Sequence, residues 1–411
     1  MILQEQASNH RQTTRSAIAK SLFVLTTIFA AQSCGPARFT DPPPAPAMSA
    51  QLDAVVYLIG DAGYATPESP VIRQLHSDVL EVPAEAEIAV VFLGDNIYWS
   101  GLHEPSHPSH PADVAHLEAQ IDVVRGTAAR GIFIPGNHDW GYKGERGMAQ
   151  IRRQGDYLAA AARQGAKVAM LPPAGCPGPT TVPLAQSVLL VAIETDLWIR
   201  DDAPAEGCPN PSTDEALASL SDILSSNEYG DDRHVVVLGH HPLKTYGPHG
   251  GYFGLKDQFF PGTKLWAPLY IPLPFVYPIV RNSGITRQDL SHSRYRWMIE
   301  QFAAVFNESA DRPLVWAAGH DHNLQVFRAG EIGVEYVLVS GAGSDFTNVG
   351  QDEALFAAGK QHGEHGYMRL EFFRDGTALL SVITDGTAAC DNDEPCAGEA
   401  TVRYWRRLAG E

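Results

Sequence analysis

The chain has 411 residues, of which 44% are apolar and 19% are charged, a composition typical of folded globular proteins. Wholesale disorder and fibrous structure are therefore excluded. Lys and Arg number 30 against 48 Asp and Glu, and the formal charge of -18 argues against nucleic acid as a partner, because phosphate backbones are bound by positive charge.

The first residues have the pattern of an export signal. Three basic residues precede an apolar run at 22–31, which is too short to span a bilayer and is typical of a signal peptide. The run is followed by Cys34, in a setting similar to a bacterial lipoprotein cleavage site. We therefore expect a signal peptide over 1–33 and a Pro-rich tether over 34–50. The chain would then be exported to the bacterial periplasm or cell surface, either lipid-anchored at Cys34 or simply secreted.

From residue 51 onward, strand and helix patterns alternate. Short apolar runs predict buried strands at 53–60, 88–93, 131–135, 188–193 and 234–238. Apolar spacing and cap residues predict helices at 67–80, 112–125, 147–163, from about 212, and at 293–306.

After residue 314 the pattern changes to strands alone. These are predicted at 314–318, 324–328, 335–339, 367–373, 379–384 and 401–406. An α/β first half followed by a β-rich end indicates a single mixed domain over 51–411, of α+β or α/β class, with two packed β-sheets flanked by helices.

One segment interrupts this pattern. The stretch 251–292 reads as an insert, and within it 265–280 contains four prolines, which exclude a transmembrane helix. It could line a pocket or rest on a membrane surface, but packing against the sandwich is the default expectation.

The five cysteines fit an exported protein. If Cys34 carries lipid, four remain, an even number suited to disulfides in an oxidising compartment. Of the three possible connectivities, the loops in which these cysteines lie favour Cys176 with Cys208 and Cys390 with Cys396.

Five segments share one design, in which an apolar strand ends in Gly and a potential metal ligand follows at once. They are Gly60-Asp61-Ala62-Gly63, Gly94-Asp95-Asn96-Ile97-Tyr98, Gly136-Asn137-His138-Asp139, Gly239-His240-His241 and Gly319-His320-Asp321-His322. Asp, Asn, His and Tyr side chains suit iron, zinc or manganese. Each segment alone is a weak signal, but the set would gather about enough ligands for two ions at one edge of the sandwich.

In this order the segments resemble the calcineurin-like metallophosphoesterases, and within them the purple acid phosphatases of the small tartrate-resistant branch. The resemblance spans roughly 55–344. It implies an αββα sandwich with a binuclear metal centre and acid phosphatase activity on a small phosphorylated substrate. The insert at 251–292 and the His- and Pro-rich stretch at 99–111 depart from the family pattern.

The resemblance also implies the role of each ligand. Asp61, Asp95, Tyr98 and His322 would hold the first metal, and Asp95, Asn137, His240 and His320 would hold the second, with Asp95 bridging. A phenolate ligand such as Tyr98 favours Fe(III), accompanied by a divalent ion (Fe, Zn or Mn). The excess positive charge of such a centre would attract phosphate inside an acidic protein.

Catalysis would be the in-line attack of a metal-bound hydroxide on phosphorus. His138 and His249 lie in or near the ligand motifs without being assigned to a metal, and are the candidate proton donors to the leaving group. Asp139 could orient His138 or be an ordinary turn carboxylate. The alternatives are a phosphodiesterase or nucleotide phosphatase on the same metals and, from another class, a noncatalytic binding lipoprotein.

Overall fold

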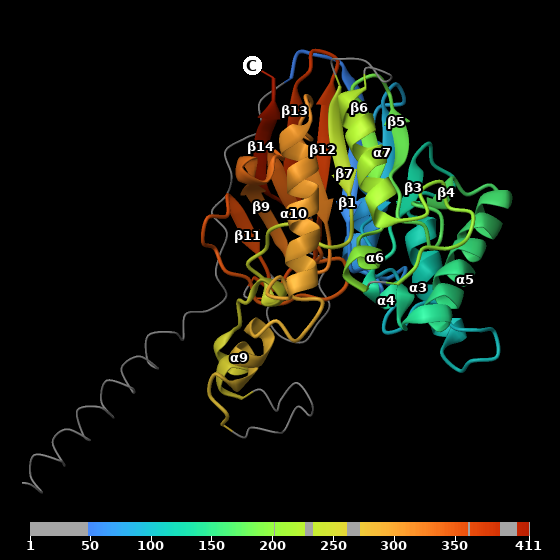
Figure 1. The fold of residues 1–411 in the computed structure, drawn as a ribbon. Coiled ribbons are helices and arrows are strands. Elements are labelled where there is room, and N and C mark those ends of the chain that lie inside the picture. Colours follow the sequence, from blue (N-terminus) through green and yellow to red (C-terminus); the bar gives the residue numbers. More distant parts are fainter. Residues whose placement is uncertain are drawn as a thin grey trace, which may run out of the picture. The chain divides into compact units, whose positions relative to one another are not determined.

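Two packed sheets, each with seven strands in the part of the chain described, form the fold in the computed structural model (Figure 1). The structure describes residues 48–200, 202–226, 233–260, 272–360, 362–386 and 401–410. The predicted signal peptide, nearly all of the tether, and Cys34, Cys390 and Cys396 lie outside these ranges. Among the residues described, none of the helices has the length and hydrophobicity needed to cross a membrane.

The first sheet has the order β14-β13-β12-β1-β2-β3-β4. Its members are β1 (Leu52–Ile59), β2 (Glu87–Phe92), β3 (Arg130–Phe133), β4 (Val168–Met170), β12 (Gly366–Phe373), β13 (Ala378–Thr384) and β14 (Thr401–Ala409). Strands β1 to β4 run parallel, and β12 pairs antiparallel with β1. Strand β1 is central and buried over nearly all its length, which explains its unbroken apolar sequence.

The second sheet has the order β11-β9-β10-β8-β7-β6-β5. Its members are β5 (Thr180–Leu184), β6 (Val188–Ala192), β7 (His234–Leu238), β8 (Val315–Ala318), β9 (Leu324–Arg328), β10 (Tyr336–Ser340) and β11 (Phe356–Ala358). Strands β6, β7 and β8 are parallel. The β-rich end of the chain is therefore divided, since β8 to β11 join this sheet and β12 to β14 join the first.

Helices surround the two sheets, and most of them flank the sandwich (Figure 1). They are α2 (Pro70–Glu81), α3 (His110–Asp122), α4 (Asn137–Trp140), α5 (Gly144–Arg163), α6 (Thr195–Arg200), α7 (Thr213–Ser225), α8 (Leu255–Phe259), α9 (Val276–Asn282) and α10 (Ser293–Glu308), with short 3₁₀ turns η2 (Pro248–Gly250) and η4 (Gly330–Ile332). Helix α7 begins after Ser212, whose hydroxyl accepts a hydrogen bond from Glu215 N, as the predicted cap requires. Helix α10 packs on the second sheet, where Phe302 and Phe306 contact Trp316 of β8.

A disulfide closes the loops on either side of β5 and β6. Cys176 and Cys208 are bonded, which confirms the first predicted pair. The predicted fold class is confirmed as well, because the sheets are packed and flanked by helices.

Candidate metal centre

Five strand ends bring the predicted ligands to one edge of the sandwich. Strands β1, β2 and β3 of the first sheet lead into Asp61, the Asp95–Tyr98 segment and Asn137, and strands β7 and β8 of the second lead into His240 and the His320–His322 segment. Because carboxyl ends of parallel strands meet at the same edge, the sequence order of the motifs becomes a spatial cluster.

The backbone at three of these positions is unusual. Asp61, Asp95 and His320 have φ of 58°, 53° and 70°, in the left-handed region that non-glycine residues seldom adopt. Each such residue costs on the order of 1–3 kcal/mol, and strain of this kind is concentrated at functional sites.

A first group forms around the Tyr98 hydroxyl. This oxygen lies 3.1 Å from Asp61 Oδ1 and 2.9 Å from His322 Nε2. The same His322 nitrogen is 3.4 Å from Asp61 Oδ1. Asp61 is fully buried and Tyr98 nearly so. A phenol, a carboxylate and an imidazole thus converge on one point.

A second group forms around the Asn137 amide. Its Oδ1 lies 3.1 Å from His240 Nε2 and 3.0 Å from His320 Nδ1. The two imidazole nitrogens are 3.2 Å apart. An amide oxygen and two ring nitrogens therefore share a second point, on the side of the cluster formed by β3, β7 and β8.

Asp95 connects the two groups. Its Oδ1 lies 3.5 Å from His240 Nε2, and the ligand atoms of Asp61, Asp95 and His240 all lie within 4.8 Å of one another. The backbone N–H of His138 donates to Asp95 Oδ1 over 2.8 Å and holds the carboxylate in this position. All seven residues that sequence reasoning assigned as ligands are thus in one cluster, with Asp95 in the middle.

Charges in the cluster strongly perturb one another. Burial raises the pKa of Asp61 to about 6 against the opposing effect of His322. Burial would also raise the pKa of Asp95, but His240 and His138 outweigh it and hold that pKa well below its usual value. Burial lowers the pKa of His240, yet Asp95 raises it to a net value of about 10. Buried carboxylates neutralised only by protonated imidazoles are the arrangement in which metal ions can replace protons.

The ring orientations also fit metal ions. His240 directs Nδ1 to the Leu93 carbonyl at 2.8 Å, and His320 directs Nε2 to the Gln288 carbonyl at 2.9 Å. A ring nitrogen facing a carbonyl carries a proton, so with a metal ion in place of any second proton the other nitrogen of each ring would present a lone pair to the cluster. The donor set therefore fits two cations, with oxygen, nitrogen and phenol donors suited to iron, zinc or manganese.

Two glycines make the close approach possible. A Cβ atom on Gly136 would overlap the carboxylate of Asp95, and one on Gly94, where φ is 94°, would overlap the ring of His240. These strand-end glycines therefore let neighbouring ligand loops approach each other closely.

The two candidate proton donors lie at a cavity of about 310 Å³ over the cluster. It is lined by Asp95, Asn137, His138, His249, Tyr277, Arg281, Thr286, Gln288, His320 and His322. His138 directs Nδ1 to the Trp99 carbonyl at 2.8 Å, and its Nε2 lies 4.0 Å from Asp95 Oδ2. His249 directs Nδ1 to the Gln288 carbonyl and to Asp289 Oδ1, both at 2.9 Å, and its ring lies 3.9 Å from that of His320.

Sequence reasoning missed the side chains that the insert places in this cavity. Tyr277 and Arg281 come from α9, and Arg281 is held by an ion pair with the buried Asp289 and by a 2.6 Å hydrogen bond to the Tyr277 hydroxyl. Gln288 was also missed, although its carbonyl accepts from both His320 and His249. None of these residues lies in a recognisable motif, and no sequence signal marks them.

The remaining motif residues support the cluster from behind. Asp139 is buried and accepts hydrogen bonds from the backbone N–H groups of Asn96, Ile97 and Gly136, so it connects two of the loops that carry ligands. The ring of His138 is oriented by the Trp99 carbonyl and not by Asp139. His241 binds Thr195 and Gln288 through its two ring nitrogens.

Asp321 and the His-rich stretch can also be placed. Asp321 accepts from His249 N and from the Thr245 hydroxyl, and so anchors the loop that carries His249. In the stretch 99–111, His103 pairs with Asp113 at 2.8 Å and stacks on His107, outside the metal-ligand cluster.

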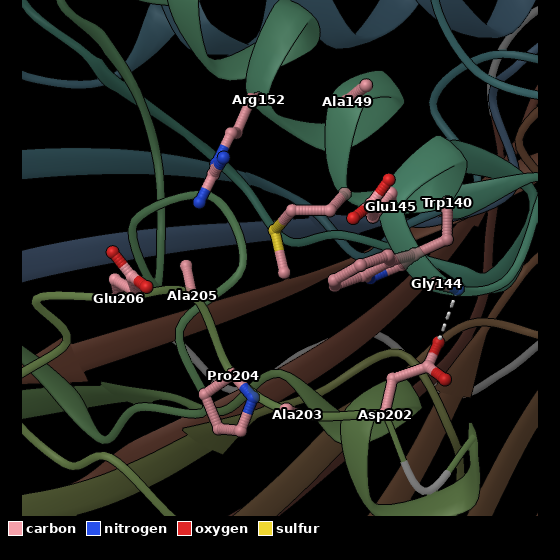
Figure 2. Close-up of a pocket in the computed structure, with 11 residues that line it drawn as sticks. Trp140, Gly144, Glu145, Ala149, Arg152, Asp202, Ala203, Pro204, Ala205 and Glu206 are labelled. Atoms are coloured by element: carbon pink, nitrogen blue, oxygen red, sulfur yellow. Dashed lines mark hydrogen bonds between the residues drawn. The ribbon is translucent and has the colours of Figure 1, made fainter.

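A larger cavity of about 610 Å³ lies elsewhere and is lined by none of the seven predicted ligands (Figure 2). Trp140, Ala149, Ala203, Pro204 and Ala205 surround it, together with the charged Glu145, Arg152, Asp202 and Glu206. Figure 2 marks a hydrogen bond that the Gly144 N–H donates to the Asp202 carboxylate. Size alone would favour this cavity, but it has no cluster of candidate metal ligands, so the smaller cavity is the candidate site.

The chain is similar to known proteins in structure but not detectably in sequence. No protein-family model matches the chain, and no curated protein matches it significantly. Among solved structures it is similar to GAP50, the anchor in the inner membrane complex of Plasmodium, at 13% identity and a TM-score of 0.47, over 87% of this chain and 89% of that one. PhoD is 11% identical with a TM-score of 0.49, over 90% and 73% of the two chains.

A third neighbour is the purple acid phosphatase PPD1 from seeds of yellow lupin (Lupinus luteus). It is 11% identical with a TM-score of 0.43, over 86% of this chain and 54% of that one. Similarities at this level carry no inference about activity, which has to be argued from the site itself.

Proposed function

We propose that this protein is a metal-dependent phosphoesterase, and specifically an acid phosphatase that hydrolyses phosphomonoesters. One observation carries the proposal. The seven side chains expected from the purple acid phosphatase motifs fall into two contacting groups, Asp61 with Tyr98 and His322, and Asn137 with His240 and His320, with Asp95 connecting them.

The proposed ligands divide the work by their chemistry. In this proposal Asp61, Tyr98 and His322 would hold a trivalent iron, because a phenolate is a hard anionic donor. Asn137, His240 and His320 would hold a divalent ion, and Asp95, which lies between the two groups, would contribute to both sites. When bound, such a pair of ions supplies positive charge to the phosphoryl oxygens and makes a nucleophile of water at neutral pH.

The chain's own residues would bind the substrate and supply the proton. Because Nδ1 of His249 faces Gln288 and Asp289, its Nε2 is the nitrogen left for the cavity. His138 is fixed in the same way by the Trp99 carbonyl. Both rings are therefore oriented to donate a proton to a leaving alkoxide, and Arg281, whose guanidinium lies 3.2 Å from His249 Nδ1, adds positive charge beside His249.

The test combines a metal assay with turnover of an aryl phosphate and the corresponding bis-aryl ester. We expect bound metal and faster hydrolysis of the monoester, with both lost in His240→Ala. Faster hydrolysis of the bis-ester would replace the proposal with a phosphodiesterase. Bound metal without turnover of either ester would favour a noncatalytic binding protein.

We further propose that the chain is exported and anchored through a lipid on Cys34. The disulfide between Cys176 and Cys208 supports an oxidising compartment. Expressed protein should fractionate with membranes, and Cys34→Ser should release it or block its processing. A Cys34→Ser protein that fractionates like the wild type would contradict the anchor.

A further inference from the structure

Exposed apolar side chains gather beside the candidate site. Among the described residues, every large apolar side chain classed as exposed, apart from Leu80 on α2, lies either at Tyr64 and Trp99 or within 252–285. Isolated exposed apolar residues need no explanation, but a collection beside one pocket marks a binding surface.

Helix α9 carries both exposed apolar side chains and side chains that line the cavity. Tyr277 and Arg281, spaced four residues apart, line the cavity. Val276 and Val280, also spaced four residues apart, lie on the flank of this face and are exposed, whereas Ile279, 66% exposed, lies on the opposite side of the helix. The segment 265–280 was expected to pack over the sandwich, but in its described part, 272–280, most side chains are exposed. Figure 1 shows α9 beyond one end of α10, outside the two sheets.

Apolar side chains also lie beside His138, which lines the cavity. Trp99 is 67% exposed, and its ring lies 5.2 Å from the ring of His138. The ring of Tyr64 lies 6.0 Å from that of Trp99. The polar cavity thus has exposed apolar groups beside two of the elements that line it, and we call Tyr64, Trp99, Val276 and Val280 the apolar rim.

We propose that the substrate is an amphiphilic phosphomonoester, a lipid-like molecule whose phosphoryl group enters the cavity while its alkyl chain lies on the apolar rim. The inference rests on the proposed function and deepens it. A single small molecule must satisfy a floor of charged ligands and a rim of exposed hydrocarbon, and only an anionic head with an apolar tail matches both. The cavity of about 310 Å³ is suited to a head group and leaves the chain to the rim.

The experiment measures binding, not turnover, of the full chain purified with its metal. Titration calorimetry with methyl-, butyl- and octylphosphonate, kept below micelle concentrations, separates head from tail. Each methylene that is fully buried should tighten binding about fourfold. The heat-capacity change of binding should become more negative with chain length, because apolar surface is removed from water.

The matched variants are Val280→Ser on the rim and Leu80→Ser elsewhere, since both side chains are exposed and neither supports the core. Val280→Ser should lower the ratio of octylphosphonate to methylphosphonate affinity, and Leu80→Ser should keep the wild-type ratio. The double variant Val276→Ser, Val280→Ser should flatten the chain-length series further.

Three results would overturn the inference. Methylphosphonate binding with no gain at longer chains would leave the proposed function standing and remove the amphiphile. No binding of any phosphonate would count against the proposed function as well. A flat series combined with binding of phosphatidylcholine vesicles that is lost in Val280→Ser would make the rim a membrane contact instead of a substrate site.

Discussion

Glu194 provides a test of the packing behind the candidate site. This residue directly precedes α6 and is fully buried. Its Oε2 accepts from Trp140 Nε1 and its Oε1 from Asp196 N, both over 2.9 Å. Trp140 ends the short helix α4 that begins at Asn137, so Glu194 braces a ligand loop without contacting the cluster itself.

The magnitude follows from the pKa of this carboxyl group. Burial, with a smaller contribution from Asp196, raises it from 4.5 to about 8. Between these two values the folded state binds more protons than the unfolded state, so the free energy of unfolding falls as pH rises. At 1.36 kcal/mol per pKa unit, the Glu194 contribution lost across this window is about 5 kcal/mol.

Glu194→Gln should remove this pH dependence, because the amide stays neutral. The substitution leaves either Trp140 Nε1 or Asp196 N facing an NH₂ group that cannot accept its hydrogen bond, which costs about 1–3 kcal/mol of stability at every pH. We therefore expect the variant to be less stable than the wild type near pH 5. The free energy of unfolding of the wild type should then fall relative to that of the variant as the pH rises to 8.5.

Urea unfolding of metal-free protein across this range measures the effect without a contribution from metal binding. Glu85→Gln, which removes an exposed carboxylate, is the control. If the stabilities of wild type and Glu194→Gln stay parallel from pH 5 to pH 8.5, the buried and neutral Glu194 of this account is wrong.

Three further predictions concern the cluster and the cavity. Tyr98→Phe should abolish visible absorption from phenolate-to-iron charge transfer in iron-loaded protein, and a spectrum that persists would refute the Tyr98 assignment. His249→Ala and His138→Ala should each slow hydrolysis of alkyl phosphates about 10²–10⁴-fold while retaining metal, and slow nitrophenyl phosphate less, because nitrophenolate leaves without a proton; equal losses for both leaving groups would exclude proton donation. Gly136→Ala should displace Asp95 and lower metal content and activity together, whereas Gly330→Ala, whose Cβ would meet open space, should change neither.

The candidate site could be anticipated from the sequence because its ligands follow strands directly. An unbroken apolar run such as β7 (His234–Leu238) indicates a buried strand, and the residue that follows must emerge at the sheet edge. The order of residue types after the glycines then separates a metal cluster from ordinary turns. All seven predicted ligands and both candidate proton donors, His138 and His249, lie at the same cavity or in the cluster beneath it.

Strand pairing could not be anticipated in the same way. Periodicity identified strands after residue 314 but says nothing about their partners, and β12 pairs with β1 more than 300 residues earlier in the chain. Strand β5, at the edge of the second sheet, was missed because Pro183 is atypical of a strand, although an edge position tolerates it.

The cavity walls were the least predictable part. Tyr277 and Arg281 reach the cavity only because α9 turns one face towards it, and the four prolines around this segment hide any helical period. The roles of Asp289 and Gln288 depend on contacts with residues about 30 to 90 positions away, which no local pattern encodes. In the function proposed here, substrate preference would depend on the segment that the sequence predicts least well.

The central claim is that this cluster binds two metal ions through two sets of side chains joined by Asp95, and metal content per chain tests it most directly. Elemental analysis of the purified wild type should find about two ions per chain. His322→Ala and His240→Ala should each lower the count towards one, Asp95→Ala should lower it further, and His107→Ala, an exposed histidine outside the cluster, should leave it unchanged. A wild-type protein that holds no ion, or a count that His322→Ala and His240→Ala do not change, would contradict the account.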